Sequence, residues 1–304
     1  MNEAGLIAAL KGRAGSRSRE LTLGIGDDCA IYSPPGAKTD LLFTTDLLVE
    51  DVHFRRRTHP PAAVGHKALA RGLSDIAAMG GEPVFCLLSL ALPAWADARW
   101  QSGFRRGFFA LARRARVTLA GGDLARAEKL ACDIVVCGRA PRGQALRRDR
   151  ARAGDAIYVS GLLGGSALGL ETGTGAAWKR HLGPEPRLRL GRFLRQRLKA
   201  TAAMDLSDGL SLDLHRLSLA SGVSARLDRP LPVFPGATLD HALHGGEDYE
   251  LLFTLPPRAK PPEFLEGLPI TRIGTIERGR PGRVEFFGQP LAPLGWDHFR
   301  RSEN

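Results

Sequence analysis

Short apolar runs alternate along the chain with longer segments in which apolar residues recur every three or four positions. The runs are typical of buried strands, and the recurring pattern is typical of helices that bury one face. Helices are expected from Pro60-Pro61 to Gly80-Gly81, along the stripe from Trp100 to Ala115, around 167–170, after Pro186 and over 210–221. Strands are expected over 41–45, 84–92, 117–120, 131–138, 156–160, 202–206, 223–227, 249–255, 270–276 and 284–287. This alternation predicts an α/β (α+β) protein with mixed sheets.

The chain has 304 residues, which is enough for about two domains of ~150 residues each. An Arg-rich, Gly-containing stretch follows residue 140, and we place the domain boundary there, giving domains 1–140 and 141–304. The longest nearly apolar run, Val84 to Ala96, is broken by Ser89 and Pro93 and is shorter than the ~20 residues of a membrane helix. We therefore expect no membrane association. The N-terminal segment lacks the basic start of a secretory signal.

The four cysteines form no CxxC pair, so neither a disulfide framework nor a zinc site is expected, and a cytoplasmic location fits best. The formal net charge of +11 is compatible with nucleic-acid binding. However, the excess is mostly arginine spread over polar helix faces, so we expect no nucleic-acid partner. The chain also lacks GxxxxGK[ST], a complete GxGxxG, the HRD and DFG pair, GxSxG and HExxH. This excludes P-loop, protein-kinase, serine-hydrolase and zincin chemistry and weakens a dinucleotide-binding reading.

Acidic residues recur beside Gly, Ser or Thr at the expected ends of strands, and one lies late on a helix. They are Asp28, Asp46, Asp75, Asp123, Asp205 and Asp208. Any one of them could cap a helix or stabilise a turn. Two carboxylates ~4 Å apart repel by ~4 kcal/mol at an effective dielectric of ~20, so a converging set needs bound cations. With hydroxyls from Thr44, Thr45 and Ser207, the oxygen ligands suit magnesium and hence a polyphosphate substrate.

Two further segments leave their interpretation open. The loop Gly161–Ser166 precedes an expected helix and could cradle a phosphate or form a tight turn. The segment Gly245–Glu250 places acids on a glycine turn that could face solvent or a ligand. His53 is isolated in sequence, and such a histidine is more often structural than functional.

Six strings together resemble the thiamine-monophosphate kinase family, in order from Leu6 to Phe299. They are GIGDDCAIY (24–32), TTDLLVEDVHF (44–54), LSDIAAMGGEP (73–83), GGD (121–123), MDLSDGL (204–210) and GGEDYELLFT (245–254). Looser forms occur across the wider superfamily of aminoimidazole-ribonucleotide synthetase-like ATP-using enzymes. The combination of TTDxLVExVHF with GGEDYEL is more specific to the kinase.

The resemblance implies magnesium- and ATP-dependent phosphorylation of thiamine monophosphate to thiamine diphosphate, the last step in making that diphosphate. It implies a homodimer in which the N-terminal domains pair their sheets and the C-terminal α/β domain covers the other side of the site. The implied ATP contacts are Gly122, Asp123, Arg148 and Ser207, and the implied thiamine monophosphate contacts are His53, Glu247 and Trp296. The implied magnesium ligands are Asp28, Thr44, Thr45, Asp46, Asp75, Asp123, Asp205 and Asp208.

The acceptor would be a phosphate monoester with a second pKa of about 6, which is already an anion at neutral pH. We therefore expect direct in-line transfer without a general base, and no catalytic side chain is assigned. The alternatives within the superfamily are purine-pathway ring closure, selenophosphate synthesis and hydrogenase maturation. Residues 1–20 lack the cysteine expected of a selenophosphate synthetase, and the sequence ends RRSEN without the terminal cysteine expected of a hydrogenase maturation protein. An alternative of another class is a basic nucleic-acid-binding protein, which the acids disfavour.

Overall fold

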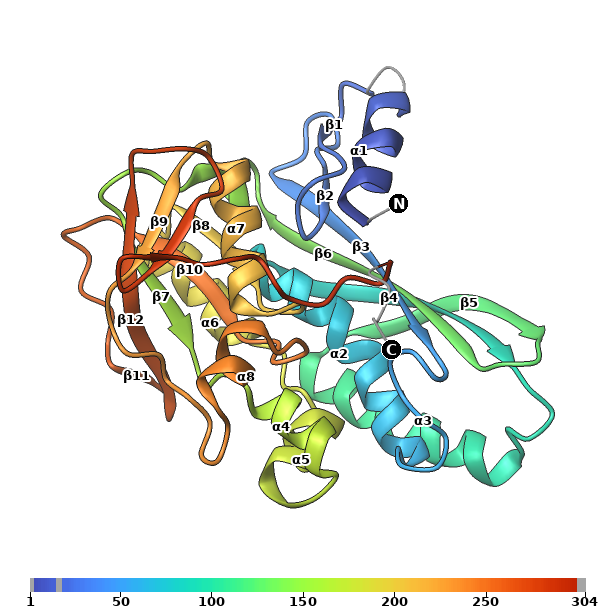
Figure 1. Ribbon diagram of the computed structural model, residues 1–304. Helices are drawn as coiled ribbons and strands as arrows, with labels where there is room; N and C mark the ends of the chain where they lie inside the picture. The colour runs from blue at the N-terminus through green and yellow to red at the C-terminus, as the bar shows by residue number, and fades with distance from the viewer. Residues whose placement is uncertain (1–2, 15–17, 300–304) are drawn as a thin grey trace.

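The computed structural model describes residues 3–14 and 18–299, which form two mixed sheets with helices packed against them (Figure 1). The first sheet has the strand order β1-β2-β3-β6-β4-β5. Its strands are β1 (Leu21–Leu23), β2 (Ala30–Tyr32), β3 (Thr39–Val49), β4 (Glu82–Leu92), β5 (Thr118–Arg126) and β6 (Ala131–Pro141). β5 pairs with β4 in parallel, and the other pairs are antiparallel. Helix α1 (Glu3–Arg13) precedes this sheet.

Two long helices, α2 (Pro61–Ala78) and α3 (Ala98–Ala115), cover one face of the first sheet (Figure 1). Pro61 occupies the first turn of α2, where no backbone donor is needed, and Asp97 caps α3 by accepting from the Trp100 N–H. The helices approach closely through glycine, since a Cβ on Gly107 would lie 1.8 Å from the Ala62 carbonyl oxygen. A closely packed helix pair therefore covers this face of the sheet.

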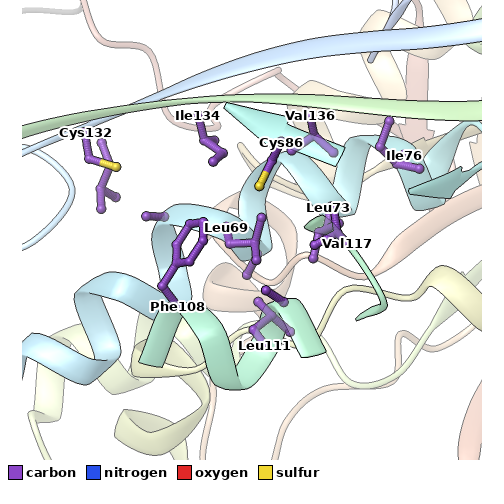
Figure 2. Close-up of a cluster of buried hydrophobic side chains, with 14 of the residues drawn as sticks. Leu69, Leu73, Ile76, Cys86, Phe108, Leu111, Val117, Cys132, Ile134 and Val136 are labelled. Atoms are coloured by element: carbon purple, nitrogen blue, oxygen red, sulfur yellow. The ribbon is translucent and has the colours of Figure 1, made fainter. Parts of the chain in front are cut away.

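The core between these helices and the sheet is aliphatic and aromatic (Figure 2). Leu69, Leu73 and Ile76 of α2 meet Phe108 and Leu111 of α3 on one side. The sheet contributes side chains from β4 and β6 on the other side, namely Cys86, Cys132, Ile134 and Val136. All four cysteines of the chain are free and buried.

The second sheet has the order β14-β13-β9-β12-β7-β10-β8, with β11 paired to β12. Its strands are β7 (Ala156–Ser160), β8 (Ala202–Asp205), β9 (Ser224–Leu227), β10 (Leu251–Leu255), β11 (Phe264–Leu265), β12 (Leu268–Glu277), β13 (Val284–Phe286) and β14 (Gln289–Pro290). Its helices are α4 (Gly165–Thr172), α5 (Gly175–Leu182), α6 (Leu188–Phe193), α7 (Leu210–Ala220) and α8 (Leu239–His244). A 3-10 turn, Arg148–Arg150, precedes β7, and a π-helical turn, Leu194–Leu198, follows α6.

The two faces of the second sheet pack on different partners. Met204 and Leu252 belong to a core that includes residues of α7, while Phe253 and Leu255 face the end of α2 and α6. Ala77 and Ala78 of α2 are fully buried in that second cluster. Helix α2 therefore contributes to a core with each sheet. After β14 the chain runs back across the molecule toward the first sheet (Figure 1).

The fold class predicted from sequence is confirmed, and most expected elements are present within a few residues. Two strands are longer than expected: β3 continues to Val49 and β5 to Arg126, so Asp46 and Asp123 lie inside strands and not at their ends. The sequence analysis did not predict the following elements: α1, β1, β2, α5, α8, β11 and β14. Among the described residues, no helix combines the length and hydropathy needed to cross a membrane.

Candidate functional site

Three carboxylates converge where the two sheets approach each other. Asp28 lies in the loop between β1 and β2, Asp75 near the end of α2, and Asp205 at the end of β8. One oxygen from each lies within 4.8 Å of the others. The convergence that the sequence argument assumed is therefore present for this trio.

Hydroxyl groups surround these carboxylates. Thr44 of β3 donates a hydrogen bond to Asp75, and Ser74 donates to Asp205 Oδ2 at 2.6 Å. Asp28 Oδ2 is buried and accepts no hydrogen bond from any described residue. An oxygen-only donor set with an unsatisfied buried oxygen fits a hard cation such as magnesium.

Burial raises the pKa of each of these acids, because the charged form loses solvation. For Asp205 the pKa rises to about 7, and hydrogen bonding from Ser74 offsets part of that rise. The pKa of Asp75 rises well above its ordinary value through burial first and then through the charges of Asp46 and Asp205. The cluster therefore holds protons near neutral pH unless a cation replaces them.

Three arginines pair with three of the predicted magnesium ligands. Arg71 Nη2 lies 3.1 Å from Asp46 Oδ1, Arg148 donates to Asp28, and Arg216 donates to Asp208. Arg216 also approaches Asp213, whose buried carboxylate accepts the backbone N–H groups of Asp208 and Gly209. Long arginine side chains from separate parts of the chain thus offset the charge of Asp28, Asp46 and Asp208, and no such pair is found for Asp75 or Asp205 among the described residues.

Two predicted ligands lie on the other face of the first sheet. Side chains alternate along β3, so Thr44 and Asp46 face α2, whereas Thr45 points away and donates to Asp133 Oδ1 at 2.7 Å. Ser89 of β4 pairs with both Asp133 and Asp123, which places Asp123 on the same side as Thr45. Within one chain, Thr45 and Asp123 are therefore separated from the trio by the sheet.

The four predicted ATP contacts lie in two separate places, two in strand β5 and two near the carboxylate trio. Gly122 (φ 155°) lies in β5, where a Cβ would be 1.8 Å from the Leu88 carbonyl oxygen, so glycine is required for strand packing. Ser207 lies in the half-buried loop after β8, and its carbonyl accepts the Glu247 N–H. Arg148 and Ser207 lie on the trio's side of the sheet, and Gly122 and Asp123 belong to the edge strand.

The three predicted thiamine monophosphate contacts gather beside α2. Glu247 Oε2 lies 2.9 Å from Lys67 Nζ, and the same ammonium is 3.3 Å from the His53 carbonyl oxygen. The rings of His53 and His298 are 5.1 Å apart, and the Trp296 indole contacts His298. Trp296 is half exposed, which leaves its face accessible to a ligand.

The loop Gly161–Ser166 and the segment Gly245–Glu250, whose roles the sequence left open, contact each other. The Asp248 carboxylate accepts the N–H groups of Gly164 at 2.6 Å and Ser166 at 3.1 Å, so these two donors of the loop Gly161–Ser166 are already taken. Glu250 is fully buried and paired with Arg180 and Arg187. The loop is thus a tight structural turn, and of the three acids in GGEDYE only Glu247 is directed toward the site.

Several residues near the site were not singled out from sequence as site residues. Lys67, Arg71 and Asp75 follow one another at intervals of four along α2, a spacing that places them on one helical face and that could have marked the first two. Asp27, whose carboxylate accepts the Arg148 N–H, adjoins Asp28 in the GDD string. No local signal distinguishes the remainder, namely Ser74, Asp133, Asp213 and Arg216.

The chain is similar to known proteins over almost its whole length. A family model described as AIR synthase related protein, N-terminal domain, matches residues 26–140. A thiamine-monophosphate kinase from Salmonella typhimurium is 39% identical over 98% of this chain and 98% of its own length. The chain belongs to the thiamine-monophosphate kinase family.

Solved structures agree with this family assignment. The structure described as AaThiL complexed with AMPPCP and TMP has a TM-score of 0.85 at 34% identity, covering 98% of this chain and 97% of that one. The hydrogenase maturation protein HypE of E. coli has a TM-score of 0.68 at 21% identity, covering 82% and 84%. The second likeness shows a shared fold alone. The kinase family thus accounts for both the motifs and the whole length of the fold.

Proposed function

We propose that this protein transfers the γ-phosphate of ATP to thiamine monophosphate and forms thiamine diphosphate. The observation that carries the proposal is the trio Asp28, Asp75 and Asp205 beside the contacts of His53 and Glu247. One element, α2, contributes Asp75 to the first group and Lys67 to the second. A polyphosphate site and an organic-ligand site would therefore lie against the same helix, which supports transfer of a phosphoryl group between them.

We propose that magnesium is held by Asp28, Thr44, Asp46, Asp75, Asp205 and Asp208. Magnesium bound there would neutralise charge on the transferring phosphoryl group and orient it toward the acceptor. Thr45 and Asp123, on the opposite face of the first sheet, would reach a metal only in an assembly that adds a second chain.

His53 would act as a neutral hydrogen-bond donor to thiamine monophosphate. Burial lowers its pKa to about 3, so the ring is uncharged at neutral pH. Its Nδ1 accepts the Val49 N–H at 3.0 Å, which places the ring proton on Nε2. Nε2 is buried and has no hydrogen-bond partner among the described residues. Glu247 and the Trp296 face would meet the cationic part of the ligand.

The homodimer is proposed from the uncovered face of the first sheet. Leu47 is 53% exposed on that face, and Leu87 is 37% exposed. Exposed leucines on a sheet face are better buried against a second copy than left in water. Such pairing would bring Thr45 and Asp123 to the interface.

Product analysis tests the activity. Purified protein is incubated with magnesium, ATP and thiamine monophosphate, and the thiamine esters are separated by chromatography. We expect thiamine diphosphate and ADP in equal amounts, and no phosphorylated product from free thiamine. Folded protein that binds magnesium ATP without forming the diphosphate would favour another reaction of the superfamily.

A further inference from the structure

We propose that the Arg71 guanidinium binds the acceptor phosphate of thiamine monophosphate during transfer. This inference rests on the proposed function and adds a substrate contact to it. Three observations carry it: the position of Arg71 along α2, its spare hydrogen-bond donors, and the engagement of the other cations near the site.

The position of Arg71 is intermediate between the two halves of the site. Lys67, Arg71 and Asp75 lie on one face of α2, and each step of four residues advances ~6 Å along the helix axis. Lys67 contacts Glu247 and the His53 backbone, whereas Asp75 belongs to the carboxylate trio. The acceptor phosphate must lie between the thiamine contacts and the ATP phosphates, which is the level of Arg71.

The Arg71 side chain is held by two hydrogen bonds that leave donors unused. Nη2 donates to Asp46 Oδ1 at 3.1 Å, and Nη1 donates to the Leu47 carbonyl at 3.3 Å. Nε is buried and has no hydrogen-bond partner among the described residues. A guanidinium has five N–H donors in a planar fork that suits phosphate oxygens. The Arg71 side chain is 13% exposed, so it is largely removed from water but can still be reached by a ligand.

The other cations near the site are engaged elsewhere. Lys67 is bound to Glu247, Arg148 to Asp27 and Asp28, and Arg216 to Asp208 and Asp213. A phosphate monoester brings a charge of about −1.5 to −2 at neutral pH. Arg71 and Arg148 each keep a buried Nε–H that no described residue accepts, but Arg148 lies at the Asp27–Asp28 end of the site. Arg71 is therefore the one of these four cations that combines a spare buried donor with the intermediate position.

The experiment must separate a phosphate contact from a mere counter-ion for Asp46. Binding of thiamine monophosphate and of free thiamine is measured by calorimetry in the presence of magnesium and a non-hydrolysable ATP analogue. The variants are Arg71→Gln, Arg71→Lys and, as a matched control, Arg189→Gln on α6, whose side chain is 73% exposed. The wild-type product assay is run in parallel.

We expect Arg71→Gln to weaken binding of the monophosphate by about 10- to 100-fold, as for the loss of a charged hydrogen bond. Binding of free thiamine and of the ATP analogue should change by less than about twofold, because neither involves the acceptor phosphate. Arg71→Lys should recover part of the affinity by its charge and serves as the test if the glutamine variant does not fold. Arg189→Gln should resemble the wild type.

The proposal would be overturned if Arg71→Gln lost affinity equally for the ester and for free thiamine. An unchanged affinity for the ester would overturn it as well. If excess magnesium restored the lost affinity for the ester, the role of Arg71 would be to hold Asp46 and the metal, and not to bind the phosphate. Wild-type protein that forms no diphosphate would reject the proposed function itself, a different outcome from any of these.

Discussion

Lys67 Nζ lies 2.9 Å from Glu247 Oε2, although the two residues are 180 positions apart in the chain. Lys67 projects from α2 against the first sheet, and Glu247 belongs to the loop before β10 of the second. Lys67 is 1% exposed and Glu247 24%, so the pair is largely removed from water. It links the two sheet layers at the point where we place thiamine monophosphate.

Lys67→Met should lower the free energy of unfolding by ~2–3 kcal/mol, because it leaves the Glu247 carboxylate without its buried partner. Lys67→Met combined with Glu247→Gln should recover much of that loss. Urea unfolding of both single variants and the double variant measures the coupling. Additive effects would mean that the ion pair contributes nothing specific.

Asp75→Asn should abolish transfer yet leave the metal-free protein as stable or more stable, by ~1 kcal/mol. Burial already disfavours the charged form of Asp75, so a neutral amide of the same shape replaces it without the cost of burying a charge. Asp240→Asn, at an 83% exposed carboxylate on α8, is the control and should keep full activity. Activity and thermal unfolding without magnesium are the measurements, and a marked loss of stability in Asp75→Asn would contradict an unfavourable burial of the Asp75 charge.

Magnesium chloride should raise the unfolding temperature more at pH 8 than at pH 6. Burial raises the pKa of Asp28 and of Asp205 to about 7, far above the value in an unfolded chain. The folded metal-free protein therefore gains protons, and with them stability, as the pH falls through 7. Magnesium competes with these protons and binds better when they are absent. A shift that is independent of pH, or that sodium chloride of equal ionic strength reproduces, would argue against the site.

Acid should destabilise the wild type more than a His181→Gln variant. His181 is buried against Trp178 and His59, and burial lowers its pKa to about 3. A histidine with a depressed pKa contributes full stability above its unfolded pKa of ~6.5 and loses it progressively as the pH falls toward 3. Between pH 7 and pH 5 the wild type should lose up to ~2 kcal/mol more than the variant.

The comparison with His181→Gln is needed because the site acids act in the opposite direction. Their raised pKa values stabilise the folded state on acidification, and this contribution cancels between two proteins that share them. Denaturant titrations at several pH values supply both curves. Parallel curves would show that His181 does not titrate differently in the two states.

Gly107→Ala should destabilise the protein by ~3 kcal/mol, because its Cβ would meet the Ala62 carbonyl oxygen at 1.8 Å and force α2 and α3 apart. Gly12→Ala is the matched control, since a Cβ on Gly12 meets nothing within 4 Å in α1. That change should alter stability by less than ~1 kcal/mol. Thermal unfolding compares them, and similar effects would mean that the helix contact tolerates expansion.

Periodicity predicted the helices and central strands well because each buries a regular face. The stripe from Val64 to Ala77 gave α2 nearly to the residue, and the apolar run at 156–160 coincides with β7. The sequence predicts that a strand ends at Thr44-Thr45-Asp46. In the structure β3 continues, and its alternate residues face opposite sides of the sheet.

Site residues could be anticipated where each lies in a string that carries the family resemblance, and could not where their contacts depend on tertiary structure. Convergence of the acids was a premise of the sequence argument, and Asp28, Asp75 and Asp205 lie close together in the structure. The separation of Thr45 and Asp123 follows from strand register, which a single sequence does not specify. The arginine partners of the acids depend on long side chains that reach across elements, as Arg216 reaches Asp208.

Helix α2 is buried along much of its length, with its middle against the first sheet and its last turn, at Ala77 and Ala78, against the second. Neither half of the molecule can melt without exposing apolar surface of the other. The chain should therefore behave in calorimetry as one cooperative unit, and severing it after β6 would leave the helix without part of its own packing. Substrate should then enter without separation of the two layers, because parting them would expose the buried side chains of α2.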